Sequence, residues 1–235
     1  MNIAVVLAGG TGSRMGSPLP KQFLQLNGRM VIEYPIDTFQ SMAEIDEICI
    51  VMHPNHLETM RQLALQRQWS KLRHIVAGGA ERYLSTAAAL SCYANSAPEC
   101  RILFHDAARP LVSPSIISRT LQALDVYQAA GVAIACVDTV WQLSAQGTLL
   151  SVPQRSSLRN AQTPQGFHLG IIRQAYQAYA DDLNRNAAPA CTDDCSVLLR
   201  YCPDIPIAVV EGEPANLKVT TPADLDRLEA FLQKC

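Results

Sequence analysis

Short apolar runs alternate with longer amphipathic segments through the first half of the chain. Five runs rich in β-branched residues predict strands at Ile3–Leu7, Glu47–Met52, His74–Val76, Arg101–His105 and Val132–Cys136. Helical spacing of apolar residues predicts helices over about 31–41, 55–68, 82–93 and 114–129. Strands separated by helices indicate a parallel sheet covered on both faces. The strands are apolar at nearly every position, as expected when both of their faces are buried.

The alternation ends after Cys136. Residues 138–155, DTVWQLSAQGTLLSVPQR, predict two short strands around the turn Ser-Ala-Gln-Gly, a hairpin that would extend from the sheet. Its apolar side chains, among them Trp141 and Leu150, would then need cover, which a second copy of the same chain could supply. The remaining pattern predicts helices near 168–180, 193–201 and 222–233 and a strand at Ile207–Val210. We therefore expect a single α/β domain over 1–235 with a protruding β-arm at about 137–157.

Composition and charge disfavour several classes of function, among them nucleic-acid binding and membrane binding. The chain has 235 residues and a formal net charge of −2, so no global positive field would recruit nucleic acid or an anionic membrane. No apolar stretch approaches the roughly 20 residues that span a bilayer, and the first residues lack the features of a signal peptide, which favours the cytoplasm. Eight cysteines occur without a CxxC pair or a zinc-like spacing, so we expect free, mostly structural thiols.

A glycine-rich loop follows the first predicted strand, in VVLAGGTGSRMGSPLPKQF. Gly9, Gly10 and Gly12 allow a tight turn that brings backbone N–H groups against a ligand. The same loop carries Arg14 and Lys21 but no acid. Backbone donors and cations together favour a ligand with several negative charges.

Two common phosphate loops do not fit this segment. A dinucleotide fingerprint needs G-x-G-x-x-G and an acid after the second strand, whereas the chain has Gly10-x-Gly12-x-x-x-Gly16 and a second strand followed by His53 and Pro54. A P-loop needs an ending in Gly-Lys-Ser or Gly-Lys-Thr, which the glycine loop lacks. The broken fingerprint also disfavours an NAD(P)-dependent oxidoreductase.

Three further clusters carry charge or small polar groups. HDAARP, residues 105–110, places Asp106 at the end of the fourth predicted strand, where it could meet a metal ion or a ligand hydroxyl, and Arg109 three residues on. NLKVT, residues 216–220, predicts a strand with Lys218 inside it. GGAERYLS, residues 78–85, places Arg82 and Ser85 at the start of a helix.

With these clusters in order, the chain resembles the family of CTP:polyol-phosphate cytidylyltransferases. The resemblance rests on LAGGTGSRMG-x-x-x-PKQF, GG-x-x-R-x-x-S, HDAARP, the arm D-T-V…P-x-R, QTPQ-x-F, TDD and NLKVT-x-P-x-DL, which extend from residue 7 to 225. It implies a Rossmann-like nucleotidyltransferase domain, a mostly parallel sheet with helices on both faces, whose arm embraces a second subunit in a homodimer. It also implies transfer of CMP from CTP to a polyol phosphate with release of pyrophosphate, aided by Mg²⁺ or another divalent cation.

The resemblance also implies roles for individual residues. CTP would be bound by Ala8, Gly9, Gly10, Gly12, Gly78, Arg82, Ser85 and Asp106, and Asp106 would also lie near the metal. Arg14, Lys21 and Lys218 would stabilise the transition state. The acceptor would be bound by Arg109, by Thr139 and Arg155 of the neighbouring subunit's arm, and by Thr163 and Thr192. A phosphate monoester is already a nucleophile, so no general base is expected and His105 is expected to be a packing residue.

The sequence motifs leave two polyol phosphates open as the acceptor of CMP. DAARP and RNAQTPQ favour the family members that act on 2-C-methyl-D-erythritol 4-phosphate, which we take as the first interpretation and which would place the chain in isoprenoid precursor synthesis. LAGG, PLPKQF, Trp141 and Pro153-Gln154-Arg155 favour those that act on ribitol 5-phosphate and make CDP-ribitol. An inactive nucleotide-binding domain is an alternative of another class, although the chain retains Arg14, Lys21, Asp106, Arg109 and Lys218.

Overall fold

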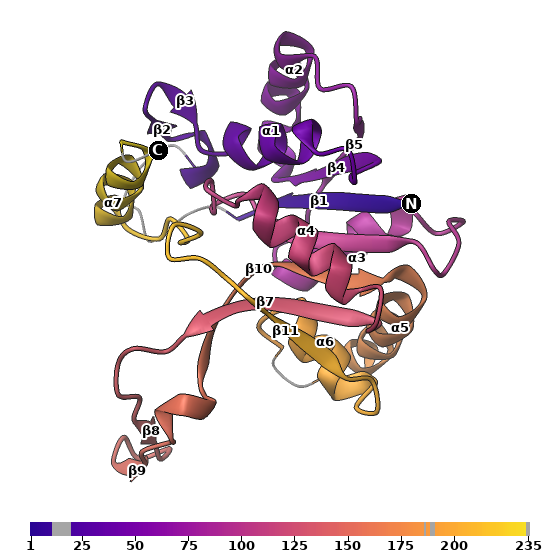
Figure 1. Ribbon diagram of the computed structural model, residues 1–235. Helices are drawn as coiled ribbons and strands as arrows, with labels where there is room; N and C mark the ends of the chain where they lie inside the picture. The colour runs from indigo at the N-terminus through magenta and orange to yellow at the C-terminus, as the bar shows by residue number, and fades with distance from the viewer. Residues whose placement is uncertain (11–19, 186, 189–190, 234–235) are drawn as a thin grey trace.

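The computed structural model describes residues 1–10, 20–185, 187–188 and 191–233. Within this part of the chain seven strands form one sheet, in the order β11-β7-β10-β6-β1-β4-β5 (Figure 1). Their bounds are β1 (Asn2–Ala8), β4 (Glu47–Met52), β5 (Leu72–Ala77), β6 (Arg101–Asp106), β7 (Ala129–Ala135), β10 (Arg159–His168) and β11 (Ile207–Glu211). All neighbours are parallel except β10, which is antiparallel to both β6 and β7. The expected mostly parallel α/β sheet is confirmed.

Alternate residues of the strands face opposite layers of helices, because successive side chains of a strand point to opposite faces. Ala4 and Val6 of β1 belong to a core with α1 (Glu33–Ser41), α2 (Leu57–Arg67) and α4 (Pro114–Ala123). Ile3 and Val5 belong to a second core on the other face, with α3 (Arg82–Cys92), α5 (Leu169–Asn184) and α6 (Asp194–Tyr201). The apolar runs of the sequence are therefore strands buried on both faces.

A third, smaller cluster joins the C-terminal helix α7 (Pro222–Leu232) to the short hairpin of β2 (Gln25–Leu26) and β3 (Arg29–Met30). Pro222 lies in the first turn of α7, as expected, and Thr221 and Asp224 form a capping box there. The same cluster contains Ala108 and Val219, so it holds two of the predicted site segments against each other.

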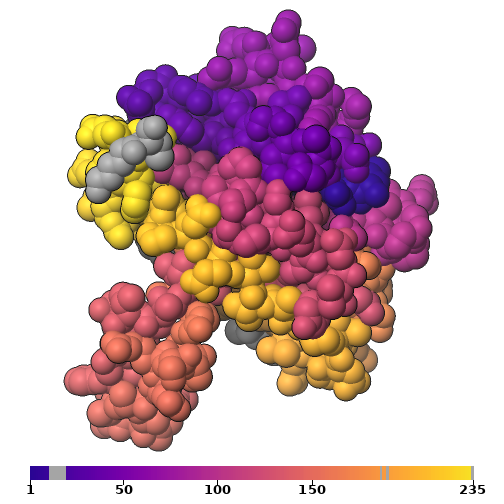
Figure 2. Space-filling model, viewed as in Figure 1, coloured from indigo at the N-terminus to yellow at the C-terminus, as the bar shows by residue number. Residues whose placement is uncertain are grey.

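The predicted arm leaves the sheet between β7 and β10 (Figure 1). Its tip is the hairpin of β8 (Gln142–Leu143) and β9 (Leu149–Ser151), and one 3-10 turn, Arg155–Ser157, leads back to β10. Figure 2 shows the arm as a lobe that extends away from the body of the molecule. Its apolar side chains are exposed: Val137, Val140, Trp141, Leu143, Leu149, Leu150 and Val152.

The local structure differs from the sequence predictions in three regions. The predicted helix over about 114–129 ends at Ala123, and β7 begins at Ala129 rather than at Val132. β10 was not predicted, because its buried polar side chains, Gln162 and Gln165 among them, hide the strand pattern. The NLKVT segment is not a strand: residues 216–220 have no regular structure, and Val219 N–H donates to the carbonyl of Ala108.

Seven cysteines lie in the described residues, and all seven are free thiols. No helix in the described ranges is both long enough and apolar enough to cross a bilayer.

Candidate active site

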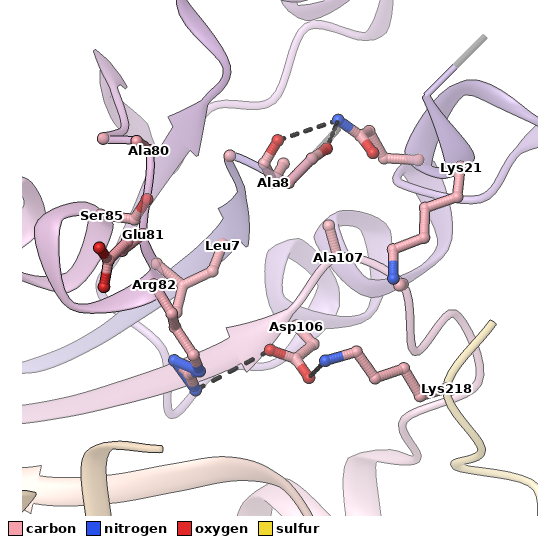
Figure 3. Close-up of a pocket in the computed structure, with 15 residues that line it drawn as sticks. Leu7, Ala8, Lys21, Ala80, Glu81, Arg82, Ser85, Asp106, Ala107 and Lys218 are labelled. Carbon is pink, nitrogen blue, oxygen red and sulfur yellow. Dashed lines mark hydrogen bonds and ion pairs between the residues drawn. The ribbon is translucent and has the colours of Figure 1, made fainter. Parts of the chain in front are cut away.

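A cavity of about 170 Å³ opens at the carboxyl edge of the sheet, where β1 and β6 end (Figure 3). The parallel strands place their carboxyl ends at this one edge, which is where open α/β sheets bind ligands. Six residues proposed to bind CTP line the cavity: Ala8, Gly9, Gly10, Arg82, Ser85 and Asp106. Lys21 and Lys218 also line it, so the structure brings together segments from both ends of the chain.

Asp106 is the centre of the charged cluster. Its Oδ2 lies 2.7 Å from Lys218 Nζ and 3.7 Å from Arg109 Nε, and its Oδ1 lies 3.8 Å from Arg82 Nη2. Figure 3 shows Arg82 and Lys218 on opposite sides of the Asp106 carboxylate. Burial raises the pKa of Asp106, but Lys218, Arg82 and Arg109 lower it by more, so its net pKa lies below the ordinary value. The carboxylate is therefore ionised, and the cations around it exceed it in charge.

Lys21 reaches the cavity from a 3-10 turn, Lys21–Phe23, and its ammonium group donates to the carbonyl of Val219 at 3.2 Å. The next residue, Gln22, is buried, and its amide donates to the carbonyls of Ala8 at 2.9 Å and of Gly10 at 3.3 Å. Gln22 thus fixes the start of the glycine loop. Gln22 lies in the PKQF motif, but its residue type alone did not predict this role.

The opposite side of the cavity is formed by Ala80, Glu81 and Ser85 (Figure 3). The hydroxyl of Ser85 lies so close to two glycines that a Cβ at Gly9 or at Gly78 would lie 2.8 Å or 2.6 Å from its oxygen. A side chain at either position would therefore require the Ser85 hydroxyl to move. Gly78 packs behind Ser85, whereas its neighbour Gly79 lines the cavity.

Arg109 and Thr163, proposed to bind the acceptor, are largely engaged within the protein. The Arg109 guanidinium donates to the carbonyls of Asn216 at 2.8 Å and of Ala161 at 3.2 Å. Thr163 is buried, and its hydroxyl accepts from the backbone N–H of Asp106 at 3.1 Å. Neither residue is among those that line the cavity.

His105 completes this buried network. Its Nε2 lies 3.0 Å from the carbonyl of Arg109, and its Nδ1 lies 3.0 Å from the Thr163 hydroxyl. A carbonyl only accepts, so Nε2 carries the hydrogen and Nδ1 accepts from Thr163. Burial lowers the pKa of His105 to about 4, so the ring is neutral at pH 7.

The remaining candidates lie apart from the cavity or outside the described residues. Thr139 and Arg155 lie on the arm, where Arg155 donates to the carbonyl of Val137 at 3.0 Å. Thr192 is exposed just before α6. Gly12 and Arg14 belong to residues 11–19, which the structure does not describe.

Asp194 of the TDD motif is a buried residue beside the site that was not among the residues predicted from the sequence. Its Oδ2 lies 2.8 Å from Arg82 Nη2. The contact joins α6 to the start of α3 and so to the cavity wall.

Known proteins of one enzyme family are similar to this chain over almost its whole length. The family model for 2-C-methyl-D-erythritol 4-phosphate cytidylyltransferase (IspD) matches residues 2–234. A 2-C-methyl-D-erythritol 4-phosphate cytidylyltransferase of Thermobifida fusca is 43% identical over 98% of this chain and 92% of its own length.

A bifunctional ribulose 5-phosphate reductase/CDP-ribitol pyrophosphorylase of Haemophilus influenzae is 36% identical over 95% of this chain, which spans 46% of that protein. The crystal structure of 4-diphosphocytidyl-2C-methyl-D-erythritol synthase from Anaerococcus prevotii has a TM-score of 0.84 and is 28% identical. That alignment covers 99% of this chain and 96% of the other.

Proposed function

Because the chain belongs to the 2-C-methyl-D-erythritol 4-phosphate cytidylyltransferase family, we propose that it transfers CMP from CTP to that polyol phosphate and releases pyrophosphate. The observation that carries the proposal is the group of cations around Asp106 at the carboxyl edge of the sheet. Two phosphorylated substrates repel each other, and fixed positive charge in a partly buried cavity offsets that repulsion.

The chemistry needs positioning and charge rather than a base. An oxygen of the acceptor phosphate attacks the α-phosphorus of CTP, the bond between that phosphorus and the bridging oxygen breaks, and its electron pair leaves with pyrophosphate. His105 takes no proton in this scheme, because both ring nitrogens are engaged and the ring is buried. Lys21 and Lys218 are assigned to the negative charge that the transition state spreads over the phosphates, together with Arg14 of the glycine loop.

The nucleotide is assigned to the cavity itself. The backbone N–H groups of Ala8, Gly9 and Gly10 would face the triphosphate, and the wall formed by Arg82 and Ser85 would face the cytosine and ribose. Support comes from Gly9, which lines the cavity and whose lack of a side chain leaves its backbone next to the ligand.

Mg²⁺ fits the donor set of this cavity. Mg²⁺ binds proteins through one or two carboxylates together with substrate phosphates, and Asp106 offers one carboxylate beside the proposed triphosphate site. Bound there, the ion would neutralise phosphate charge and orient the triphosphate.

The arm supports a homodimer and a shared acceptor site. Its exposed apolar side chains, Trp141 at 64% exposure among them, would be covered by a second copy of the chain. In that arrangement Thr139 and Arg155 would reach the acceptor phosphate in the partner's site, where Arg109, Thr163 and Thr192 are also assigned. We place the enzyme in the cytoplasm, where isoprenoid precursors would be made.

Ribitol 5-phosphate is the second candidate acceptor, favoured by the Haemophilus influenzae relative and by Trp141 on the arm. Pyrophosphate release should be measured with CTP and Mg²⁺ against 2-C-methyl-D-erythritol 4-phosphate, ribitol 5-phosphate and glycerol 3-phosphate. We expect kcat/KM to be highest for the methylerythritol phosphate. A higher value for ribitol 5-phosphate would transfer the assignment to that acceptor, and no release with any of them would favour an inactive nucleotide-binding domain.

A further inference from the structure

A fully buried carboxylate lies behind the nucleotide wall, the side of the cavity that is formed by Arg82 and Ser85. Asp194, the first residue of α6, is 0% exposed. Its Oδ1 accepts from the hydroxyls of Thr86 at 2.8 Å and Tyr176 at 2.6 Å, and its Oδ2 lies 2.8 Å from Arg82 Nη2. Removing an ionised carboxylate from water is costly unless it is paired and hydrogen-bonded. Among the described residues, Arg82 is the cation that forms an ion pair with it.

The backbone of Asp194 is held as firmly as its side chain. Its N–H donates to Gln165 Oε1 at 3.0 Å, and Gln165 in turn donates to the Asp193 carboxylate at 2.6 Å. Asp193 and Ser196 form the capping box of α6. The carboxylate therefore has a fixed position relative to β10, which carries Gln165, and is a rigid support for whatever it contacts.

Arg82 lies between two carboxylates as a result. Its Nη2 forms a close ion pair with Asp194 Oδ2 at 2.8 Å and lies farther from Asp106 Oδ1, at 3.8 Å. Burial lowers the pKa of the Arg82 guanidinium, and Asp194 and Asp106 raise it by more, so the guanidinium stays charged. Asp194 thus holds the guanidinium back from Asp106, while Lys218 occupies Asp106 Oδ2.

We propose that Asp194 is a positioning residue that fixes Arg82 at the nucleotide wall and keeps Asp106 Oδ1 available to the bound nucleotide and its metal ion. The inference rests on the proposed function. Without the Asp194 charge, the nearest carboxylate for Arg82 is that of Asp106, and the guanidinium would close on Oδ1. The cavity would then lose both a correctly placed cation and a free carboxylate oxygen.

The test is CTP binding by titration calorimetry without acceptor, beside steady-state kinetics. Asp194→Asn keeps the size of the side chain and an oxygen for Thr86 and Tyr176, but it presents N–H donors to Arg82. We expect CTP affinity to fall about tenfold to a hundredfold, the range for losing a hydrogen bond to a charged group. The KM for the acceptor should change less than about twofold, a split that general loss of structure would not produce.

Two comparisons separate positioning from a purely structural role. Tyr176→Phe removes one hydrogen bond from Asp194 without touching the ion pair, so it should lower stability and leave CTP affinity within about twofold of wild type. In an Arg82→Met background, Asp194→Asn should cause no further loss of CTP affinity, because Asp194 acts through Arg82.

Wild-type CTP affinity in a folded Asp194→Asn protein would overturn the proposal, as would an additive loss in the Arg82→Met background. If Asp194→Asn does not fold, Asp194→Glu keeps the charge but displaces it by one methylene group; unchanged CTP affinity there would also count against it. Failure of the proposed function has a different signature: the wild-type protein itself would neither bind CTP nor release pyrophosphate with an acceptor.

Discussion

Replacing His105 with Gln should reduce the dependence of stability on pH between 5 and 8. His105 is completely buried, with one ring nitrogen donating to the Arg109 carbonyl and the other accepting from Thr163. A proton added to the ring at Nδ1 would face the hydroxyl of Thr163, whose own hydrogen would then lose its acceptor. Gln can still donate to the Arg109 carbonyl, but it does not titrate in this range.

The size of the expected change in stability follows from the pKa of His105 in the unfolded and in the folded protein. Burial lowers the pKa of His105 from 6.5 to about 4 in the folded protein, so the unfolded chain binds this proton more tightly. The stabilisation is fully present above pH 6.5 and is lost as the pH falls toward 4. Complete loss corresponds to about 3 kcal/mol, of which about 2 kcal/mol is lost between pH 8 and pH 5.

Urea unfolding of the wild type and of His105→Gln at pH 8 and pH 5, at equal protein concentration, measures this difference directly. The other titrating groups are common to both proteins and cancel. We expect the wild type to lose about 2 kcal/mol more than the variant on going from pH 8 to pH 5. Equal losses in the two proteins would refute the reasoning that a neutral, buried His105 supports the backbone of Asp106 and Arg109.

Three further predictions follow from the same structure. Lys218→Met should lower kcat/KM by about 10²–10³, the usual effect of removing one charge-stabilising donor, and pyrophosphate release at the wild-type rate would remove Lys218 from the mechanism. Asp224→Asn should lower the free energy of unfolding at pH 7 by about 1–2 kcal/mol, because Thr220 and Thr221 donate to the Asp224 carboxylate. Hydrogen bonds lower the pKa of Asp224 to about 2 despite burial, so the difference from wild type should shrink as the pH falls from about 4 toward 2; a constant difference in urea unfolding would argue against it. Trp141→Glu should shift sedimentation toward a monomer, and an unchanged sedimentation coefficient would show that the arm does not join subunits.

The strands with buried faces could be predicted because their signal is local. Ile3–Leu7 and Ile48–Met52 are continuous apolar runs, and each lies within a strand of the sheet. β10 gave no such signal, since Thr163, Pro164 and Gly166 interrupt it and its buried amides are satisfied only by distant partners. β7 begins with Ala129 and Ala130, which have weak β-propensity, so the sequence pattern placed the end of the preceding helix at about residue 129 and the start of the strand at Val132.

The residues of the candidate site were also only partly predictable from the sequence. Asp106, Lys218 and Arg82 were singled out as charges in motifs, yet nothing local indicated that Lys218 pairs with Asp106, 112 positions away. Asp194 was missed because its role depends on contacts with α3, such as the one with Thr86, 108 positions away. Contacts of this kind depend on the whole fold, which one sequence without its structure does not provide.

The most direct test of the account is a crystal structure of the protein with CTP. We expect the triphosphate to lie beside Lys21 and the backbone of Gly9 and Gly10, with the cytosine next to Ser85 and the ribose near Asp106. A triphosphate bound away from the carboxyl ends of β1 and β6 would contradict the claim that the cations gathered there bring two phosphorylated substrates together.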